Sequence, residues 1–94
     1  MAKYVAILTH GRRDGEGRYE FEADEKLLSD TPVRIMRVCM ESIENQLQVG
    51  HIDYQINAAF KNDKYEIATV IGEIIRENGD HQPFMCMISH PEKI

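Results

Sequence analysis

The sequence predicts an α+β domain in which one helix crosses one face of a five-stranded antiparallel sheet. Three observations support this class. Five short segments either alternate apolar and polar residues or are apolar on both faces, and one longer segment repeats apolar residues every three or four positions. Turn-forming Gly, Asn and Asp residues stand between these segments. The elements follow in the order ββαβββ.

The first two strands are predicted at residues 3–10 and 18–24. Segment 3–10 is apolar on both faces, whereas 18–24 alternates apolar and charged residues. The stretch THGRRDGEGRYEF, residues 9–21, brings three glycines to their junction, so a hairpin with a long connection is expected. Its glycines match neither GxGxxG nor GxxxxGK, and a strand follows where a phosphate loop requires a helix.

The helix is predicted to begin at Pro32, with Thr31 as its N-cap. Its apolar stripe consists of Ile35, Met36, Cys39, Met40, Ile43 and Leu47. Gly50 is expected to stop the helix.

The last three strands are predicted at 52–61, 65–78 and 84–89. Segment 52–61 alternates, and 84–89 is apolar on both faces. Segment 65–78 is long for a strand, and its alternation slips near Gly72. This favours a β-bulge at Gly72, or a helix in the second half of the segment.

Strands that are apolar on both faces belong in the middle of a sheet, which favours the strand order 2-1-5-4-3. The competing order sets strand 2 beside strand 3 as a parallel pair and buries two polar-faced strands. In element order and patterning over most of its length, the chain resembles profilin-like, longin and PAS-type domains. No motif is shared, so the resemblance implies a fold and no function.

Composition restricts the classes of function. The chain is expected to be a single domain spanning 1–94. Its net charge of −5 argues against general binding to nucleic acid. No apolar run approaches the ~18 residues of a membrane span. Cys39 and Cys86 form no metal motif, so free thiols, no cofactor and a cytoplasmic location are expected.

One face of the sheet is expected to remain uncovered. Five strands about 4.8 Å apart make a sheet wider than a helix of about 10 Å, and no second helix is predicted. The apolar residues assigned to this face are Val5, Ile7, Val70, Ile74, Met85 and Met87. Such a patch usually marks an interface, so a homodimer through this face or through an edge strand is expected. The alternative is a narrower patch that stays hydrated.

Histidines are the candidates for chemistry near neutral pH. The predicted order places His10, His51 and His81 at one end of the sheet and His90 at the other. His10 and His81 lie on neighbouring strands, and Glu73 is a further candidate because the slip in alternation leaves its direction open. No HxH or HExxH spacing is present, so no metal site is predicted, and solvated loop histidines are the alternative.

Candidate ligand-binding residues fall in two places. Arg12 and Arg13 lie in the glycine-rich stretch, where they could contact an anion. His51 and Asp53 begin a row of polar residues on one face of segment 52–61. The alternative for this row is the hydrated face of an edge strand.

The first functional expectation is a small intracellular homodimeric binding or regulatory module, an adaptor, inhibitor or accessory protein. Such a module could also bind a separate protein partner. An enzymatic function is less expected than a binding function, because no catalytic motif or activated nucleophile is recognised. The alternatives are a small histidine-dependent enzyme or metal-binding protein, and an anion- or nucleotide-sensing domain that uses the loop 11–18.

Overall fold

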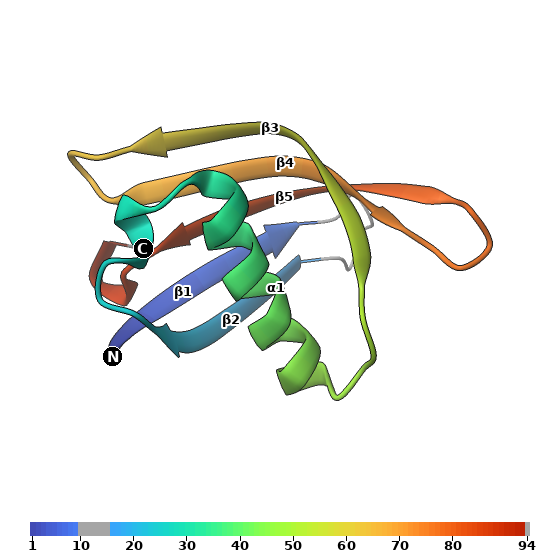
Figure 1. The fold of residues 1–94 in the computed structure, drawn as a ribbon, viewed down its shortest axis with the longest axis horizontal. Coiled ribbons are helices and arrows are strands. Elements are labelled where there is room, and N and C mark those ends of the chain that lie inside the picture. Colours follow the sequence, from blue (N-terminus) through green and yellow to red (C-terminus); the bar gives the residue numbers. More distant parts are fainter. Residues whose placement is uncertain (10–15, 94) are drawn as a thin grey trace.

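The structure is a computed structural model, and it describes residues 1–9 and 16–93. Five strands form one antiparallel sheet, and a helix packs across one of its faces (Figure 1). The strands are β1 (Ala2–Thr9), β2 (Glu16–Ala23), β3 (Asp53–Asn62), β4 (Ile67–Ile75) and β5 (His81–Ser89). The helix is α1 (Pro32–Leu47), and two 3-10 turns are η1 (Leu27–Ser29) and η2 (Pro91–Lys93).

The predicted α+β class and strand order are confirmed. The order is β2-β1-β5-β4-β3, so β5 is the middle strand and β2 and β3 are the edges. The three central strands are those whose sequences are apolar on both faces. This agrees with the rule that central strands are covered more completely than edge strands.

The core lies between α1 and the face of the sheet that α1 covers, referred to here as the inner face. The opposite face is the outer face. The core side chains include Tyr4, Phe21, Ile35, Met36, Met40, Ile43, Val70, Phe84 and Ile88. Cys39 of α1 and Cys86 of β5 are both fully buried here. The hydrogen bond with Cys86, and then burial, raise the pKa of the Cys39 thiol, which therefore behaves as a small core side chain.

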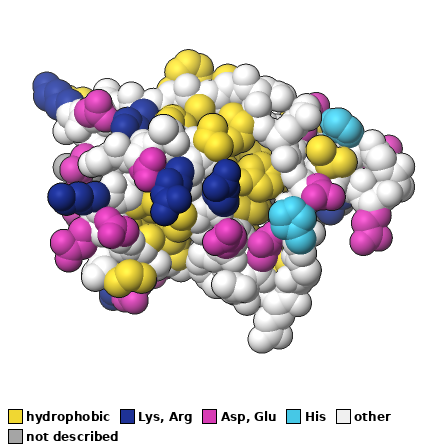
Figure 2. All heavy atoms as spheres, in the orientation of Figure 1, with side chains coloured by type: hydrophobic (Ala, Val, Ile, Leu, Met, Phe, Trp, Pro, Cys, Tyr) yellow, Lys and Arg dark blue, Asp and Glu magenta, His cyan; other side chains and the backbone are white. Residues whose placement is uncertain are grey.

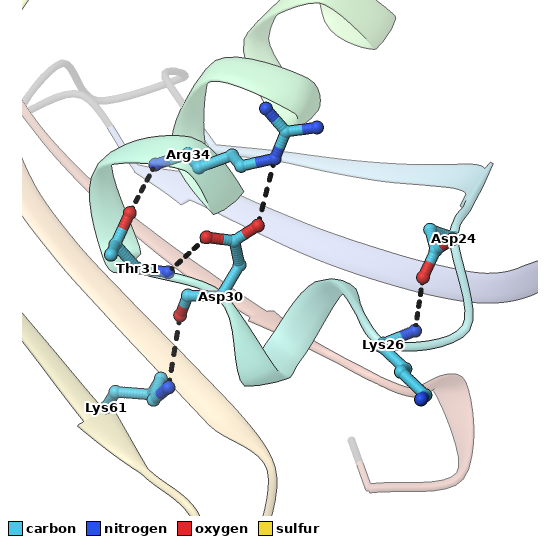
Figure 3. Close-up of polar contacts among 6 residues, drawn as sticks. All are labelled: Asp24, Lys26, Asp30, Thr31, Arg34 and Lys61. Carbon is cyan, nitrogen blue, oxygen red and sulfur yellow. Dashed lines mark hydrogen bonds and ion pairs between the residues drawn. The ribbon is translucent and has the colours of Figure 1, made fainter.

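The start of α1 is held by a short polar network, drawn in Figure 3. Thr31 is the N-cap, as predicted, and its Oγ1 accepts a hydrogen bond from the backbone N–H of Arg34 at 3.3 Å. Asp30 accepts from the Thr31 N–H at 2.7 Å and pairs with Nε of Arg34 at 2.9 Å. Lys61 Nζ donates to the Asp30 carbonyl at 3.0 Å, which ties β3 to the helix start.

The helix ends earlier than predicted. Gln48, not Gly50, is the C-cap, in the left-handed conformation with φ 56°. The N–H of Val49 returns to the carbonyl of Glu44 at 3.2 Å, and the Glu44 carboxylate accepts from the Ile52 N–H at 2.5 Å. These bonds stabilise the turn from α1 into β3 without a glycine at the cap.

The β-bulge predicted at Gly72 in β4 is found instead in β3. Gly72 stays in register within β4, and the register shift falls in β3 between Ile56 and Ala58, so Asn57 is the bulged residue. The helical alternative for the second half of 65–78 is also wrong, because β4 continues to Ile75. A Cβ at Gly72 would lie 2.2 Å from the Gln55 carbonyl oxygen. The glycine therefore allows the bulged β3 to approach β4 closely.

The β4–β5 hairpin projects beyond the neighbouring strands (Figure 1). Its turn is closed by the Arg76 N–H, which donates to the Asp80 carbonyl at 2.8 Å, and Gly79 takes φ 89°. β5 begins at His81, three residues earlier than predicted. His81 is thus a strand residue with a defined direction, and not a loop residue before the strand.

Candidate functional site

The outer face carries an apolar surface over the middle of the sheet. Residues directly opposite each other on antiparallel strands point to the same face, so strand pairing arranges the side chains in rows. One row is Arg18, Ile7, Met87, Thr69 and Phe60, and the next is Thr9, Met85, Ile71 and Ala58. The apolar patch is defined as Ile7, Ala58, Phe60, Ile71, Met85 and Met87. Phe60 is 61% exposed, Met85 48% and Ile71 39%, so the patch reaches solvent.

Two residues assigned to this surface from the sequence lie on the other face. Val70 lies opposite Cys86 and is fully buried in the core, and Ile74 packs against the same core. Their place on the outer face is taken by Ile71, opposite Met85. The prediction was wrong because β4 is apolar in both phases of its alternation, so the pattern could not assign a phase to either face.

Phe60 was missed for a related reason. Alternation from Ile52 places Phe60 on the inner face. The extra residue at Asn57 reverses the phase of β3, so Phe60 points outward and Lys61 points inward. No feature of the sequence marks Asn57 as the bulged position.

One corner of the outer face is covered. Val5 lies on this face, because it pairs with Glu20 and Ser89, yet it is fully buried. Pro91 of η2 lines a small hollow together with Lys3 and Glu20. Lys3 and Glu20 belong to the outer face, so η2 lies over the β1–β2 corner. The solvent-exposed part of the face is therefore narrower than predicted and centred on β5 and β4.

A polar cluster borders the apolar patch on the hairpin side. Glu73 lies opposite Gln55, and its carboxylate accepts hydrogen bonds from Gln55 Nε2 at 2.5 Å and Asn57 Nδ2 at 3.3 Å. Nδ1 of His81 lies 3.7 Å from the other carboxylate oxygen. These four residues form the Glu73 cluster. The open direction of Glu73 is thereby resolved, since it points to the outer face and not into the core.

The cluster favours the ionised form of Glu73. Hydrogen bonds from Gln55 and then Asn57 lower the pKa of Glu73 below its ordinary value of 4.5, and the nearby His81 acts in the same direction. Slight burial opposes them but does not prevail. A fixed negative charge with amide partners therefore stands beside the apolar patch.

A cleft of about 910 Å³ lies at the base of the β4–β5 hairpin. It is lined by residues 51–53 at the start of β3 and by hairpin residues 74–78 and 80–83. The predicted site residues His51, Asp53 and His81 thus share one cleft. Within it the Arg76 guanidinium donates to the side-chain oxygen of Gln82, a largely buried residue that the sequence did not single out.

Several polar groups of the cleft contact one another or the neighbouring Glu44. His51 Nδ1 lies 3.3 Å from Glu44 Oε2, and its Nε2 lies 3.2 Å from Asp53 Oδ1. No Ser, Thr or Cys of the described residues lines the cleft. The arrangement can hydrogen-bond a polar ligand, but it presents no nucleophile next to a base.

His90 lies elsewhere, as predicted. Its ring stacks on Tyr4 with centroids 4.9 Å apart, and its Nε2 lies 3.3 Å from Glu66 Oε2. Within residues 1–9 and 16–93, no group of three or more His, Cys, Asp or Glu side chains is arranged to hold a metal ion.

The inner face is not fully covered by α1. Figure 2 shows this side of the molecule, where apolar side chains remain visible between α1 and β3, with charged side chains along the helix. Met40 and Tyr54 line a groove of about 260 Å³ there, together with Arg37, Glu41, Glu44 and His51. Charged side chains make up half of the lining, so this groove is more polar than the patch on the outer face.

His10, Arg12 and Arg13 fall outside the described residues, so the predicted His10–His81 approach and the arginine-containing loop stay predictions. Comparisons of the chain with models of protein families, with curated proteins and with solved structures gave no match. Among the described residues, no helix has the length and apolar character needed to cross a bilayer.

Proposed function

We propose that this protein is a small homodimeric binding or regulatory module, an adaptor, inhibitor or accessory protein that acts through the apolar patch on its outer face. The observation that carries the proposal is the set of exposed apolar side chains, Phe60, Ile71 and Met85, over strands at the middle and one edge of the sheet. Contiguous exposed apolar surface of this kind marks interaction sites in soluble proteins.

The size of the face suits such an interface. Five strands about 4.8 Å apart, each about nine residues long at about 3.3 Å per residue, give an area on the order of 700 Å². A standard stable interface takes about 800 Å² from each partner. Because η2 covers the β1–β2 corner, the exposed part of the outer face is smaller than this area, and the side chains at its rim contribute the rest of an interface of this size.

The chemistry of the patch supports binding more than catalysis. Met85 and Met87 occupy its centre on β5, and flexible thioether side chains adapt well to an apposed surface. The neighbouring Glu73 carboxylate accepts hydrogen bonds from Gln55 and Asn57 of its own chain, so it can enter an interface with hydrogen-bond partners in place. The proposal includes a reducing cytoplasmic setting, in keeping with the free Cys39 and Cys86.

Light scattering coupled to size exclusion tests the proposal. The chain has a mass of 10.9 kDa, and the expected result at about 50 µM protein is twice that mass. Met85→Glu places a charge at the centre of the patch, and we expect the monomer mass for this variant.

Val33→Glu is the matched control. Val33 is a similarly exposed apolar residue, 52% accessible, on the first turn of α1, away from the sheet. This variant should keep the mass of the wild type. A monomeric wild type, or an equal loss of mass in both variants, would refute the homodimer.

A further inference from the structure

We infer that the second copy packs face to face on the outer face, related by a two-fold axis that runs parallel to β5, so that β2 of each protomer lies over β3 of its partner. This inference rests on the proposed function and adds the geometry of the dimer. It predicts which side chains meet across the interface, namely Arg18 with Phe60 of the second copy.

Pairing through the sheet edges is disfavoured on both sides. At the β2 edge, Gln46 Nε2 of α1 donates to the Glu20 carbonyl at 2.8 Å and occupies an acceptor that an added strand would need. At the β3 edge, the bulge at Asn57 breaks the ladder, and Lys61 points inward toward the Asp30 carbonyl. Bulges and inward-pointing charges are devices that oppose strand addition. Association through the face is the remaining mode.

A closed dimer that joins two like faces requires a two-fold axis lying between the sheets. Because β5 is the middle strand, with two strands on either side, such an axis can run along β5 or across it (Figure 1). An axis along β5 places β2 over β3 of the partner. An axis across the strands places β2 over β2 and β3 over β3.

Charge distinguishes these two arrangements. The outer face of β2 presents Arg18, Glu20 and Glu22, and Arg18 pairs with Glu20 at 3.4 Å, so β2 over β2 would leave an excess of two carboxylates from the two copies. The outer face of β3 from Ala58 to Asn62 is neutral and carries the exposed ring of Phe60. Like charges that face each other across an interface are destabilising, and stable interfaces have complementary charges. The axis along β5 avoids this repulsion.

The same axis produces a favourable contact at each end of the central row. Arg18 and Phe60 terminate the row that passes through Ile7, Met87 and Thr69. Rotation about β5 reverses this row, so the Arg18 guanidinium lies over the Phe60 ring of the partner, and Met87 faces Met87. A guanidinium over an aromatic ring is attracted by the ring quadrupole.

Cysteine cross-linking tests the geometry. Arg18→Cys and Phe60→Cys are prepared separately, one of them with a mass tag, mixed, and treated with a bismaleimide that spans about 10 Å, the spacing of packed sheets. The mixed, tagged-to-untagged product should exceed the product of either variant alone by about tenfold. Wild-type protein is the reagent control, because Cys39 and Cys86 are fully buried.

The outcomes separate this inference from the proposed function. A dimer in which Phe60→Cys cross-links to itself more than to Arg18→Cys overturns the axis along β5 and leaves the homodimer standing. A dimer that gives no mixed product overturns it as well. A protein that is monomeric by light scattering removes both proposals.

A charge-reversal pair provides a second readout that needs no reagent. Arg18→Glu should weaken the dimer by about tenfold, because it removes the cation over Phe60 and adds one carboxylate per chain to the interface. Lys26→Glu makes the same charge change on an exposed residue beside η1, away from the outer face, and should leave the dimer unchanged. Equal weakening by both variants would contradict the contact.

Discussion

Glu73 shows how much one side chain depends on its neighbours. In the sequence it is a carboxylate of undetermined direction within a strand that is apolar on both faces. In the structure it lies on the outer face and accepts hydrogen bonds from Gln55 and Asn57 on β3. These partners lower its pKa, and that shift links the fold to pH.

We predict that Glu73 makes the fold less stable in acid. Because its pKa in the folded chain is below the ordinary value of 4.5, the ionised carboxylate stabilises the fold above that value. This contribution is lost as the pH falls from about 4.5 through the lower pKa of the folded state. The free energy of unfolding, measured in urea between pH 7 and pH 3, should therefore fall more steeply for wild type than for Glu73→Gln.

Glu41→Gln, on the exposed side of α1, serves as the control and should keep the wild-type slope. An NMR titration of the Glu73 carboxyl carbon measures the pKa directly. A midpoint at or above 4.5 would contradict the role assigned to the amides.

At the scale of elements, the pairing of β3 with β4 determines which residues the outer face presents. The bulge at Asn57 turns Phe60 outward, and Gly72 lies beside the bulge, where a side chain would collide with the Gln55 carbonyl. The two features act together. A glycine in β4 admits the close approach that the irregular β3 requires.

Gly72→Ala is therefore predicted to destabilise the fold by about 1–3 kcal/mol, since a new Cβ 2.2 Å from a backbone oxygen forces the strands apart. Gly50→Ala is the matched control. No atom lies within 4 Å of a Cβ at Gly50, so this variant should be neutral or more stable by about 0.4–1 kcal/mol. Chemical denaturation of the two variants checks the difference. Equal stabilities would show that β3 and β4 can move apart at no cost.

At the scale of the whole molecule, one helix and one sheet leave the chain with a single well-covered face. A chain of about 90 residues buries only about 60–65% of its unfolded surface, so its own core is modest. Burying the outer face against a second copy would add apolar contact that the monomer lacks. Stability should then depend on protein concentration.

The melting temperature should rise by about 6–11 °C between 1 µM and 100 µM protein. A hundredfold increase in protein concentration raises the free energy of unfolding by about 2.7 kcal/mol per dimer, or about 1.4 kcal/mol per chain. Each 1 kcal/mol shifts the melting temperature of a domain this size by about 4–8 °C. Met85→Glu should melt at one temperature throughout this range. Scanning calorimetry or fluorimetry measures both, and a wild type without concentration dependence would count against the dimer.

Local patterning was enough to predict the elements and their order. The period of the apolar residues separated the helix from the strands, and Thr31 with Pro32 located the helix start. Apolar faces on both sides of three strands identified the centre of the sheet, because only central strands need cover on both sides. The same reasoning predicted an uncovered face and placed Ile7, Met85 and Met87 on it.

Only the tertiary structure decided which residues complete that face. In β4 either set of alternate residues could face the core, so the sequence does not decide which set does. Pairing with β5 places Ile71 on the outer face and Val70 on the inner face. The phase of β3 depends on a bulge that one strand cannot reveal alone, because a bulge is a property of two paired strands. The Glu73 cluster and the cleft at the hairpin join residues from different strands. Contacts that form only when strands pair cannot be recognised in any single segment of the sequence. Burial can be recognised, because it leaves a pattern of apolar residues in every element.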